Sequence, residues 1–158
     1  MRRPFDEIVT EHGPAVMRVC RALLGSADAQ DAWSETFMAA LKAYPRLRED
    51  SNVRGWLVTI AQRKAIDQLR AAARAPAASA EPSEPAAASA APAEPDSALR
   101  AALDALPPMQ RGAVIHRYLG DLPHVDVALL LGCSEAAARR NAADGIASLR
   151  KRIRKEDR

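Results

Sequence analysis

The sequence predicts an all-α protein in which two small helical domains are joined by a flexible linker. Aromatic residues make up only 4% of the 158 residues, whereas alanine, leucine and arginine are abundant, so the cores should be helical and aliphatic. Both ends of the chain repeat apolar residues at helical spacing. The stretch 71–97 holds five of the eleven prolines and no aromatic or branched aliphatic residue that could be buried. We therefore expect domains at 1–74 and 98–158, with a linker at 75–97.

The first domain should contain three helices. Their apolar periodicity places the first at residues 5–24 and the third at 53–70, and the second between them, from a cap at Ser26 or Asp28 to about Ala43. Gly13 and Pro14 predict a break or kink in the first helix. Candidate capping residues stand at the start of the other two: Ser26 or Asp28, and Ser51 or Asn52. The apolar sides of the second and third helices are expected to include Phe37, Leu41, Trp56, Ile66 and Leu69.

The second domain carries the pattern of a helix-turn-helix motif. A helix at 97–106 should end at Pro107 and Pro108, and helices at 109–119 and 122–131 should follow. Gly132 predicts a tight turn, and Ser134 is placed to cap a long terminal helix. An ordinary αα-hairpin would have the same periodicity, so the pattern alone leaves both open. The shared core is expected to contain Val127, Leu130, Leu131, Ala138 and Ile146.

Charge is distributed unevenly along the chain. Residues 1–75 carry a net charge of +3, residues 76–97 a net charge of −4, and residues 98–158 a net charge of +4. Two basic ends that flank an acidic middle favour a polyanion as partner. The N-terminal segment lacks the apolar core of a signal peptide, and no run approaches the roughly 18 apolar residues of a membrane span. We expect a soluble, cytoplasmic protein without membrane insertion.

The residue types that perform catalysis or bind metals are sparse and scattered. Cys20 and Cys133 are the only cysteines, and neither stands in a CxxC or Cys/His cluster, which argues against a zinc site and a disulfide framework. The three histidines, His12, His116 and His124, are scattered without a partnered nucleophile, and no glycine-rich phosphate-binding loop is present. We therefore expect a protein that is not an enzyme and needs no cofactor or metal.

Four segments, taken in order, resemble a known family. They are DAQDAWSETFMAALKAY, VRGWLVTIAQRKAIDQLR, LDALPPMQRGAVIHRYLGDL and VALLLGCSEAAARRNAADGIASLRKR. In sequence and spacing they resemble the two domains of the extracytoplasmic-function (ECF) group of bacterial RNA polymerase sigma factors, which belongs to the sigma-70 family. The resemblance implies a region 2 domain at 1–74, which binds core polymerase and the minus-10 element, and a region 4 helix-turn-helix domain at 98–158, which binds the minus-35 element.

The resemblance also implies two sets of contact residues in the first domain. The acidic helix resembles the surface that docks on the largest polymerase subunit, with Ser34 standing where the family usually has Gln. The residues implied in core-polymerase binding are Asp28, Asp31, Ser34, Glu35 and Phe37. The helix over 53–70 resembles the element that opens the minus-10 element, with Arg63 where the family usually has Asn. The residues implied in minus-10 binding are Arg63, Lys64, Asp67 and Arg70.

The terminal helix resembles the one that reads the minus-35 element in the major groove. The residues implied in that contact are Ser134, Glu135, Arg139, Arg140 and Asn141. Arginine can bind guanine or phosphate through two hydrogen bonds, so Arg139 and Arg140 keep the chemistry that the groove requires. Asp144 would repel phosphate, and Gly145 lowers helix stability by roughly 1 kcal/mol relative to alanine. Both residues depart from what such a helix prefers.

The sequence thus favours a sigma factor that binds core RNA polymerase and promoter DNA, with an anti-sigma factor as a further partner that the resemblance allows. Two alternatives belong to other functional classes. One is a stand-alone helix-turn-helix regulator, which would not need the two segments of the first domain. The other is a degenerate sigma-like protein that acts mainly by protein–protein interaction, a possibility kept open by the substitutions in the terminal helix.

Overall fold

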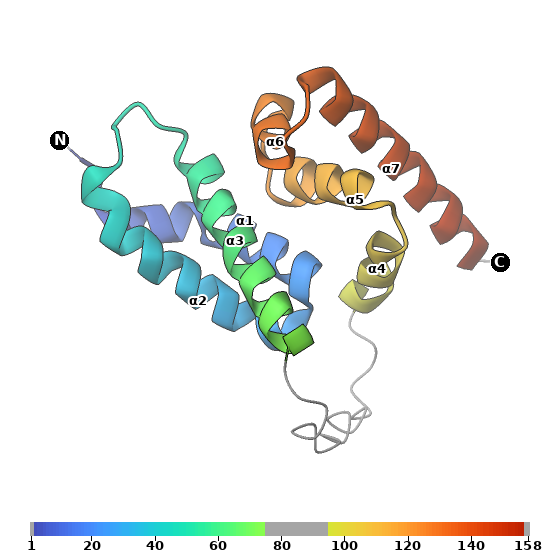
Figure 1. The fold of residues 1–158 in the computed structure, drawn as a ribbon, viewed down its shortest axis with the longest axis horizontal. Helices are drawn as coiled ribbons and strands as arrows, with labels where there is room; N and C mark the ends of the chain where they lie inside the picture. Colours follow the sequence, from blue (N-terminus) through green and yellow to red (C-terminus); the bar gives the residue numbers. More distant parts are fainter. Residues whose placement is uncertain (1, 75–94, 157–158) are drawn as a thin grey trace, which may run out of the picture.

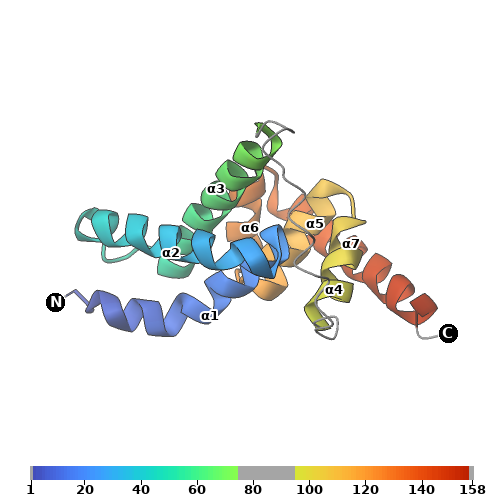
Figure 2. The same ribbon diagram turned by 90° about the horizontal axis from the view of Figure 1, so that it is seen from below.

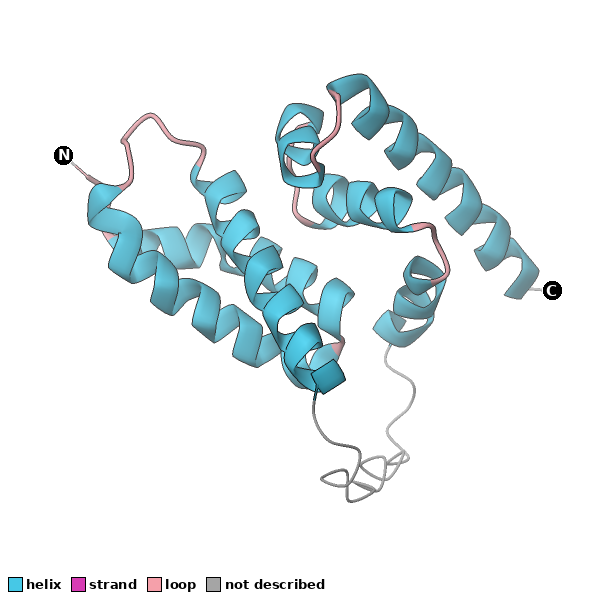
Figure 3. Cartoon of the chain, viewed as in Figure 1, coloured by secondary structure: helices cyan, strands magenta, loops and turns pink. Residues whose placement is uncertain are grey.

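A computed structural model describes residues 2–74 and 95–156, and every regular element in these ranges is helical (Figure 3). The predicted linker at 75–97 lies outside the described residues except for its last three positions, which belong to the first turn of a helix. Figure 1 shows two groups of helices, which we call the first half (2–74) and the second half (95–156). The all-α prediction is confirmed.

The first half is a bundle of three long helices. They are α1 (Phe5–Leu24), α2 (Ser26–Ala43) and α3 (Val53–Arg74), with a short 3-10 turn, η1 (Tyr44–Arg46), after α2. Each helix packs against the other two along a core of aliphatic side chains and Phe37. Fully buried members of that core include Ile8, Val16, Cys20, Ala32, Leu57, Ala61 and Ala65. The three predicted helices are therefore present in the predicted order.

The first half differs from prediction at three points. No break occurs at Gly13 and Pro14, because α1 continues as one helix with Pro14 inside it; the other expected outcome, a kink within a continuous helix, stays a prediction. Helix α3 extends to Arg74, four residues beyond its predicted end. Neither Ser26 nor Asp28 caps α2; Gly25, with a φ of 84°, precedes the helix, and Ser26 is its first residue. Asn52 does cap α3, since its Oδ1 accepts a hydrogen bond from the backbone N–H of Gly55 at 3.1 Å.

The second half contains α4 (Pro95–Asp104), α5 (Pro108–Val114), the π-helical turn η4 (Ile115–Leu119), α6 (His124–Leu131) and α7 (Glu135–Glu156). Between α6 and α7, Gly132 adopts the left-handed conformation with a φ of 68°, which glycine enters without steric cost. The Ser134 Oγ then accepts a hydrogen bond from the Ala137 backbone N–H at 3.1 Å. The α6–turn–α7 unit is thus the predicted helix-turn-helix, and its cap is the predicted serine.

The helices of the second half approach closely at Gly145 of α7. A Cβ atom at this position would lie 2.5 Å from the Val114 Cγ2 and 3.2 Å from the Gln110 carbonyl oxygen, both on α5. Only a residue without a side chain fits such a crossing. The glycine that looked unfavourable for a helix is therefore required by the packing of α5 on α7. Of the predicted shared core, Val127 and Ala138 are buried, and Leu130, Leu131 and Ile146 pack partly buried against it.

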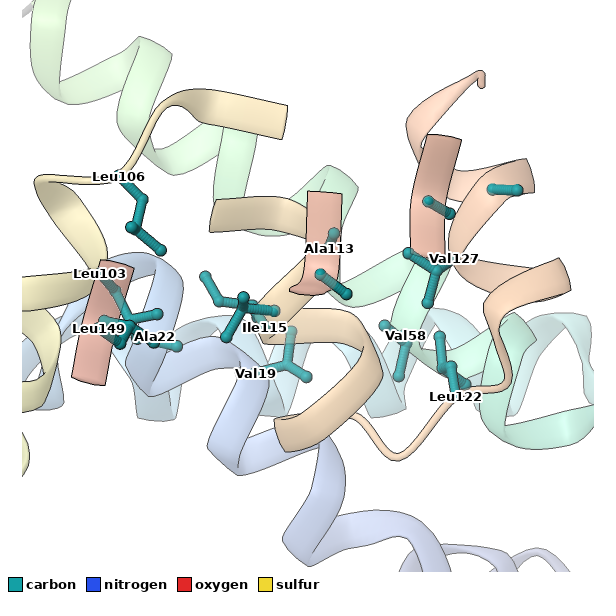
Figure 4. Close-up of a cluster of buried hydrophobic side chains, with 14 of the residues drawn as sticks. Val19, Ala22, Val58, Leu103, Leu106, Ala113, Ile115, Leu122, Val127 and Leu149 are labelled. Carbon is teal, nitrogen blue, oxygen red and sulfur yellow. The ribbon is translucent and has the colours of Figure 1, made fainter. Parts of the chain in front are cut away.

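The two halves share a hydrophobic cluster. Val19 and Ala22 of α1 and Val58 of α3 are buried in the same cluster as Leu103, Ile115 and Leu122 of the second half (Figure 4). Helix α1 contacts η4 along this interface. In both views the N-terminal end of α1 and the C-terminal end of α7 lie at opposite ends of the molecule (Figures 1 and 2).

His116 in η4 is buried, and its Nδ1 atom has no hydrogen-bond partner. Burial lowers the pKa of His116 from 6.5 to about 4. Between these two pH values the unfolded chain binds more protons than the folded one, so stability is fully present above pH 6.5 and falls as the pH is lowered toward 4. We expect the free energy of unfolding to lose on the order of 3 kcal/mol from this group.

Urea unfolding of the wild type and of His116→Gln at pH 7 and pH 4.5 measures this linkage. Carboxyl groups titrate in both proteins, so the comparison isolates the histidine. The wild type should lose more stability than the variant between the two pH values. Equal losses would contradict a folded state in which His116 stays neutral.

Candidate nucleic-acid and protein interfaces

The N-terminal turns of α7 present polar side chains to solvent. One side of the helix is occupied by the core, because Ala138, Ala142, Gly145 and Leu149 are buried. The predicted contact residues Ser134, Glu135, Arg139 and Arg140 are exposed, whereas Asn141 is half-buried and donates a hydrogen bond to the Ala137 carbonyl oxygen at 3.0 Å. A recognition helix needs a polar, solvent-facing start of this kind, and amphipathic surface helices in general share the arrangement.

The two arginines on this surface differ in their neighbours. Arg139 forms an ion pair with Glu135, with 2.7 Å between Nη2 and Oε1. Among the residues that the structure describes, none forms an ion pair with Arg140. Asp144 is also exposed and lies one helical turn from Arg140, on the same side of α7. Over residues 135–144, α7 therefore presents one cation without an ion-pair partner (Arg140), one ion pair (Arg139 with Glu135) and one further acid (Asp144).

The pKa of His124, at the start of α6, is lowered by burial and by the positive charge nearby. Its Nδ1 is buried and has no hydrogen-bond partner. Partial burial lowers the pKa of His124, and the positive charges of Arg139 and Arg117 lower it further. A neutral imidazole is favoured beside these cations.

A second polar surface lies on α3. Arg63, Asp67 and Arg70 are exposed and follow one another at helical spacing, and Lys64 is half-buried. A cleft of about 420 Å³ lies between this helix and α6. Its walls are formed by Asn52, Gly55, Trp56, Thr59, Gln62, Arg63 and Ile66 on the first half, and by Asp126, Leu129 and Leu130 on α6.

The cleft contains residues that the sequence analysis assigned to the apolar side of α3. Trp56 is half-buried and lines the cleft, and Ile66 is 37% exposed. Leu69, one turn further on, is 49% exposed. The apolar periodicity continued along the helix, but burial is concentrated on Leu57, Val58, Ala61 and Ala65. These exposed apolar residues add a hydrophobic component to a surface whose predicted contact residues, Arg63, Lys64, Asp67 and Arg70, are all polar.

The acidic surface lies on α2. Asp28, Asp31, Ser34 and Glu35 are all exposed, as a docking surface requires. Phe37 is only 6% exposed, with its ring 4.6 Å from that of Trp33, so it supports the helix from within the core. Sequence reasoning missed Met38, which is 62% exposed, and it placed Leu41 on the apolar side although this residue is 56% exposed. Met38 and Leu41 stand four and seven residues after Ser34, so helical spacing places them on the same exposed side of α2. That spacing was the signal available in the sequence.

The described residues contain no group of three or more His, Cys, Asp or Glu side chains that could hold a metal ion. Burial raises the pKa of the Cys20 thiol to about 11, which keeps it protonated and unreactive near neutral pH. None of the described helices is long and apolar enough to cross a bilayer.

Comparisons with known families identify two conserved regions in the chain. The family described as Sigma-70 region 2 matches residues 8–75, and the family described as Sigma-70, region 4 matches residues 96–149. The chain is 30% identical over 149 residues to the ECF RNA polymerase sigma factor SigM of Mycobacterium tuberculosis, which covers 94% of this chain and 76% of the relative. It is also 30% identical over 151 residues to the RNA polymerase sigma factor CarQ of Myxococcus xanthus, covering 92% and 87% of the two chains.

Solved structures share the fold. The sigma factor RpoE of Bartonella quintana, in complex with the anti-sigma factor NepR, superposes with a TM-score of 0.75 at 21% identity, over 95% of this chain and 96% of that one. CnrH, in complex with the cytosolic domain of CnrY, superposes with a TM-score of 0.70 at 23% identity, over 94% and 86% of the two chains.

Proposed function

Because the chain belongs to the ECF group of RNA polymerase sigma factors, in the sigma-70 family, we propose how its two halves divide the work of that family. The protein is a sigma factor that binds core RNA polymerase and directs promoter recognition and transcription initiation. The observation that carries the assignment is that both sigma-70 regions match, in order, on the helices of the two halves. It acts by binding, so it requires no catalytic residue or cofactor, and its place of action is the cytoplasm.

We assign the surface of α2 to core polymerase. Asp28, Asp31, Ser34 and Glu35 supply its polar and charged part, and Met38 adds an apolar contact beside them. A charged rim around an exposed apolar side chain is typical of a protein–protein interface. Phe37 contributes by holding the helix in place, because its ring is enclosed by the core.

We assign α3 to the minus-10 element and α7 to the minus-35 element. On α3, Arg63 and Arg70 supply positive charge for phosphates, while Trp56 and Ile66 offer apolar surface for unstacked bases. Lys64 and Asp67 lie beside them. On α7, the capped N-terminal turns carry Ser134, Glu135, Arg139, Arg140 and Asn141 toward the major groove.

The domain limits that we propose are residues 1–74 for region 2, 75–97 for the linker and 98–158 for region 4. A linker of that length allows the two DNA-binding helices to reach elements separated by about two turns of duplex. An anti-sigma factor is the further partner that we propose, which is consistent with the complexes of RpoE with NepR and of CnrH with CnrY.

In vitro transcription tests the proposal directly. The protein is added to core polymerase with a pool of promoter fragments, and start sites that depend on the added protein are mapped. New start sites preceded by two conserved elements are expected. Binding to duplex DNA without any effect on core polymerase would favour the stand-alone regulator, and binding to core polymerase without new start sites would favour the degenerate sigma-like protein.

The two arginines of α7 should contribute unequally to binding of the minus-35 element. Arg140 has no ion-pair partner among the described residues, so its full charge is available to phosphate. Arg139 must first break its ion pair with Glu135 before it can bind phosphate. Arg140→Ala should reduce the slope of log affinity against log salt by about one unit. Arg139→Ala should have a smaller effect.

The measurement is a salt titration of holoenzyme binding to a promoter that carries both elements. Two further variants of α7 are measured in the same way and should change affinity in the opposite direction. Glu135→Gln frees Arg139, so it should strengthen binding. Asp144→Asn removes an acid beside Arg140 and should also strengthen it. If all four variants match the wild type, α7 does not contact the promoter through this face.

A further inference from the structure

We propose that a pocket between α1 and α4 binds a small molecule that carries one or two phosphate groups and an apolar part, as a nucleotide does. Three arginine side chains, the start of α2 and an apolar wall meet in this pocket. None of the surfaces assigned to polymerase or to promoter DNA includes it. The proposal therefore adds a ligand to the functions described above.

The pocket has a volume of about 530 Å³, which lies in the usual range for small-molecule sites. It forms where the C-terminal end of α1 and the start of α2 meet α4. Ala22 of α1 and Leu103 of α4 lie side by side in one hydrophobic cluster and both line the pocket (Figure 4). The cavity thus has a wall from each half of the chain.

Positive charge dominates the walls of this pocket. Arg18 and Arg21 of α1 and Arg100 of α4 line it, against one carboxylate, that of Asp104. Among the described residues no acid forms an ion pair with any of the three arginines. Asp104 instead pairs with Arg111, with 3.9 Å between Oδ1 and Nη1. Guanidinium groups gathered around one cavity repel one another, and an anion between them turns that repulsion into attraction.

Arg100 has the features of a ligand-binding arginine. Its Nε atom is buried and has no hydrogen-bond partner among the described residues, although buried guanidinium N–H groups ordinarily have one. The guanidinium lies against the backbone of Gly25, where a Cβ atom would be 2.8 Å from Nη1 and 3.1 Å from Cζ. A side chain at Gly25 would therefore displace the guanidinium from the first turn of α2.

The start of α2 adds to the positive potential of the pocket. No side chain caps this helix, which follows Gly25 directly. The first N–H groups of a helix carry a partial positive charge, so a helix start favours an anion. Asp28, the acid of the first turn, does not line the pocket. A guanidinium beside a helix start is unfavourable by itself, and a phosphate that binds both removes the conflict.

The apolar wall fits a ligand that has an uncharged part beside its phosphates. Leu99, Leu103 and Leu119 line the pocket together with the arginines. Arginine binds phosphate through two parallel hydrogen bonds, and three arginines balance one or two phosphate groups of about −1.5 to −2 charge each. A nucleotide combines such groups with a flat base that can pack on leucine side chains. Nucleotides are therefore suitable probes.

Calorimetric titration of the full chain, without polymerase and at constant ionic strength, tests the site. The probes are inorganic phosphate, pyrophosphate, AMP and ADP, and magnesium is omitted so that the phosphate oxygens remain free for the arginines. Pyrophosphate should bind more tightly than phosphate, because it can engage more guanidinium groups. ADP should bind about tenfold more tightly than pyrophosphate, because its base adds contact with the apolar wall.

Substitutions of single arginines assign the binding to this pocket. Arg100→Gln removes a charged donor and should weaken ADP binding about ten- to a hundredfold. Arg21→Gln should also weaken it, and because Arg21 is exposed this variant tests the site without altering a packed position. The matched control is Arg46→Gln, which removes the same charge from an exposed position beyond the opposite end of α2. Its affinity for ADP should equal that of the wild type.

The circular-dichroism signal of all three variants should match that of the wild type. Absence of binding by every probe at millimolar concentration would overturn the site. Equal loss of ADP binding in Arg21→Gln and Arg46→Gln would do the same, because it would show attraction by the net charge of the chain alone. Equal affinity for ADP and pyrophosphate would contradict the role of the apolar wall. None of these measurements involves polymerase or promoter DNA, so their outcome is independent of the proposed function.

Discussion

Replacing Asp31 and Glu35 together by lysine is expected to abolish copurification of the protein with core RNA polymerase. Both carboxylates are exposed on α2, one turn apart on the same side of the helix. Reversing two charges at an interface replaces attraction by repulsion, and like charges brought together can cost several kcal/mol. Neither residue contributes to the core, so the helical circular-dichroism signal should be unchanged.

Glu49→Lys with Asp50→Lys is the matched control, because it makes the same change of net charge on the loop before α3. Copurification should survive in this control. Affinity chromatography on tagged core polymerase measures both variants under the same salt conditions. Wild-type binding by the α2 variant, or equal loss in both variants, would remove α2 from the polymerase interface.

Gly145→Ala is expected to destabilise the protein by about 1 to 3 kcal/mol, the usual cost of forcing extra atoms into a packed core. On an exposed helix the same change would be stabilising by roughly 1 kcal/mol, so intrinsic helix propensity predicts the opposite sign. The new Cβ would lie 2.5 Å from the Val114 Cγ2, which forces α5 and α7 apart. Urea unfolding followed by circular dichroism measures the change.

Val114→Ala in the same chain separates the clash from other effects. It removes the methyl group that the new Cβ would meet, so the two substitutions together should cost less than the sum of their separate costs. Additive costs would show that the Val114 contact is not the cause. A gain in stability from Gly145→Ala alone would contradict the close crossing of α5 and α7.

Local features of the fold were predictable because local chemistry determines them. The turn at Gly132, the Ser134 cap and the Asn52 cap each depend on residues within a few positions of one another. Of the break or kink predicted at Gly13 and Pro14, the break is absent because packing of α1 against α2 and α3 outweighs the lost backbone hydrogen bond. Gly145 could not be understood locally, because its partner Val114 lies on another helix.

The candidate site was predictable to a similar extent. The family resemblance implied the acids of α2, and they are exposed. Periodicity placed Leu41 on the buried side, because the periodic pattern does not show where the neighbouring helix ends. Packing between the halves was beyond prediction. It depends on contacts such as Arg54 with Asp121, which are 67 residues apart in the chain, and nothing in either segment indicates the other.

The small side chains between the halves bear on how the chain is made in the cell. The first half is synthesised before the second, so Val19, Ala22 and Val58 remain exposed to water until Leu103, Ile115 and Leu122 have been added. Apolar patches of a few hundred Å² are tolerated on soluble proteins, while larger ones promote aggregation. Short side chains keep this patch modest. Enlarging them to leucine or phenylalanine would therefore endanger the solubility of the first half before the second half is complete.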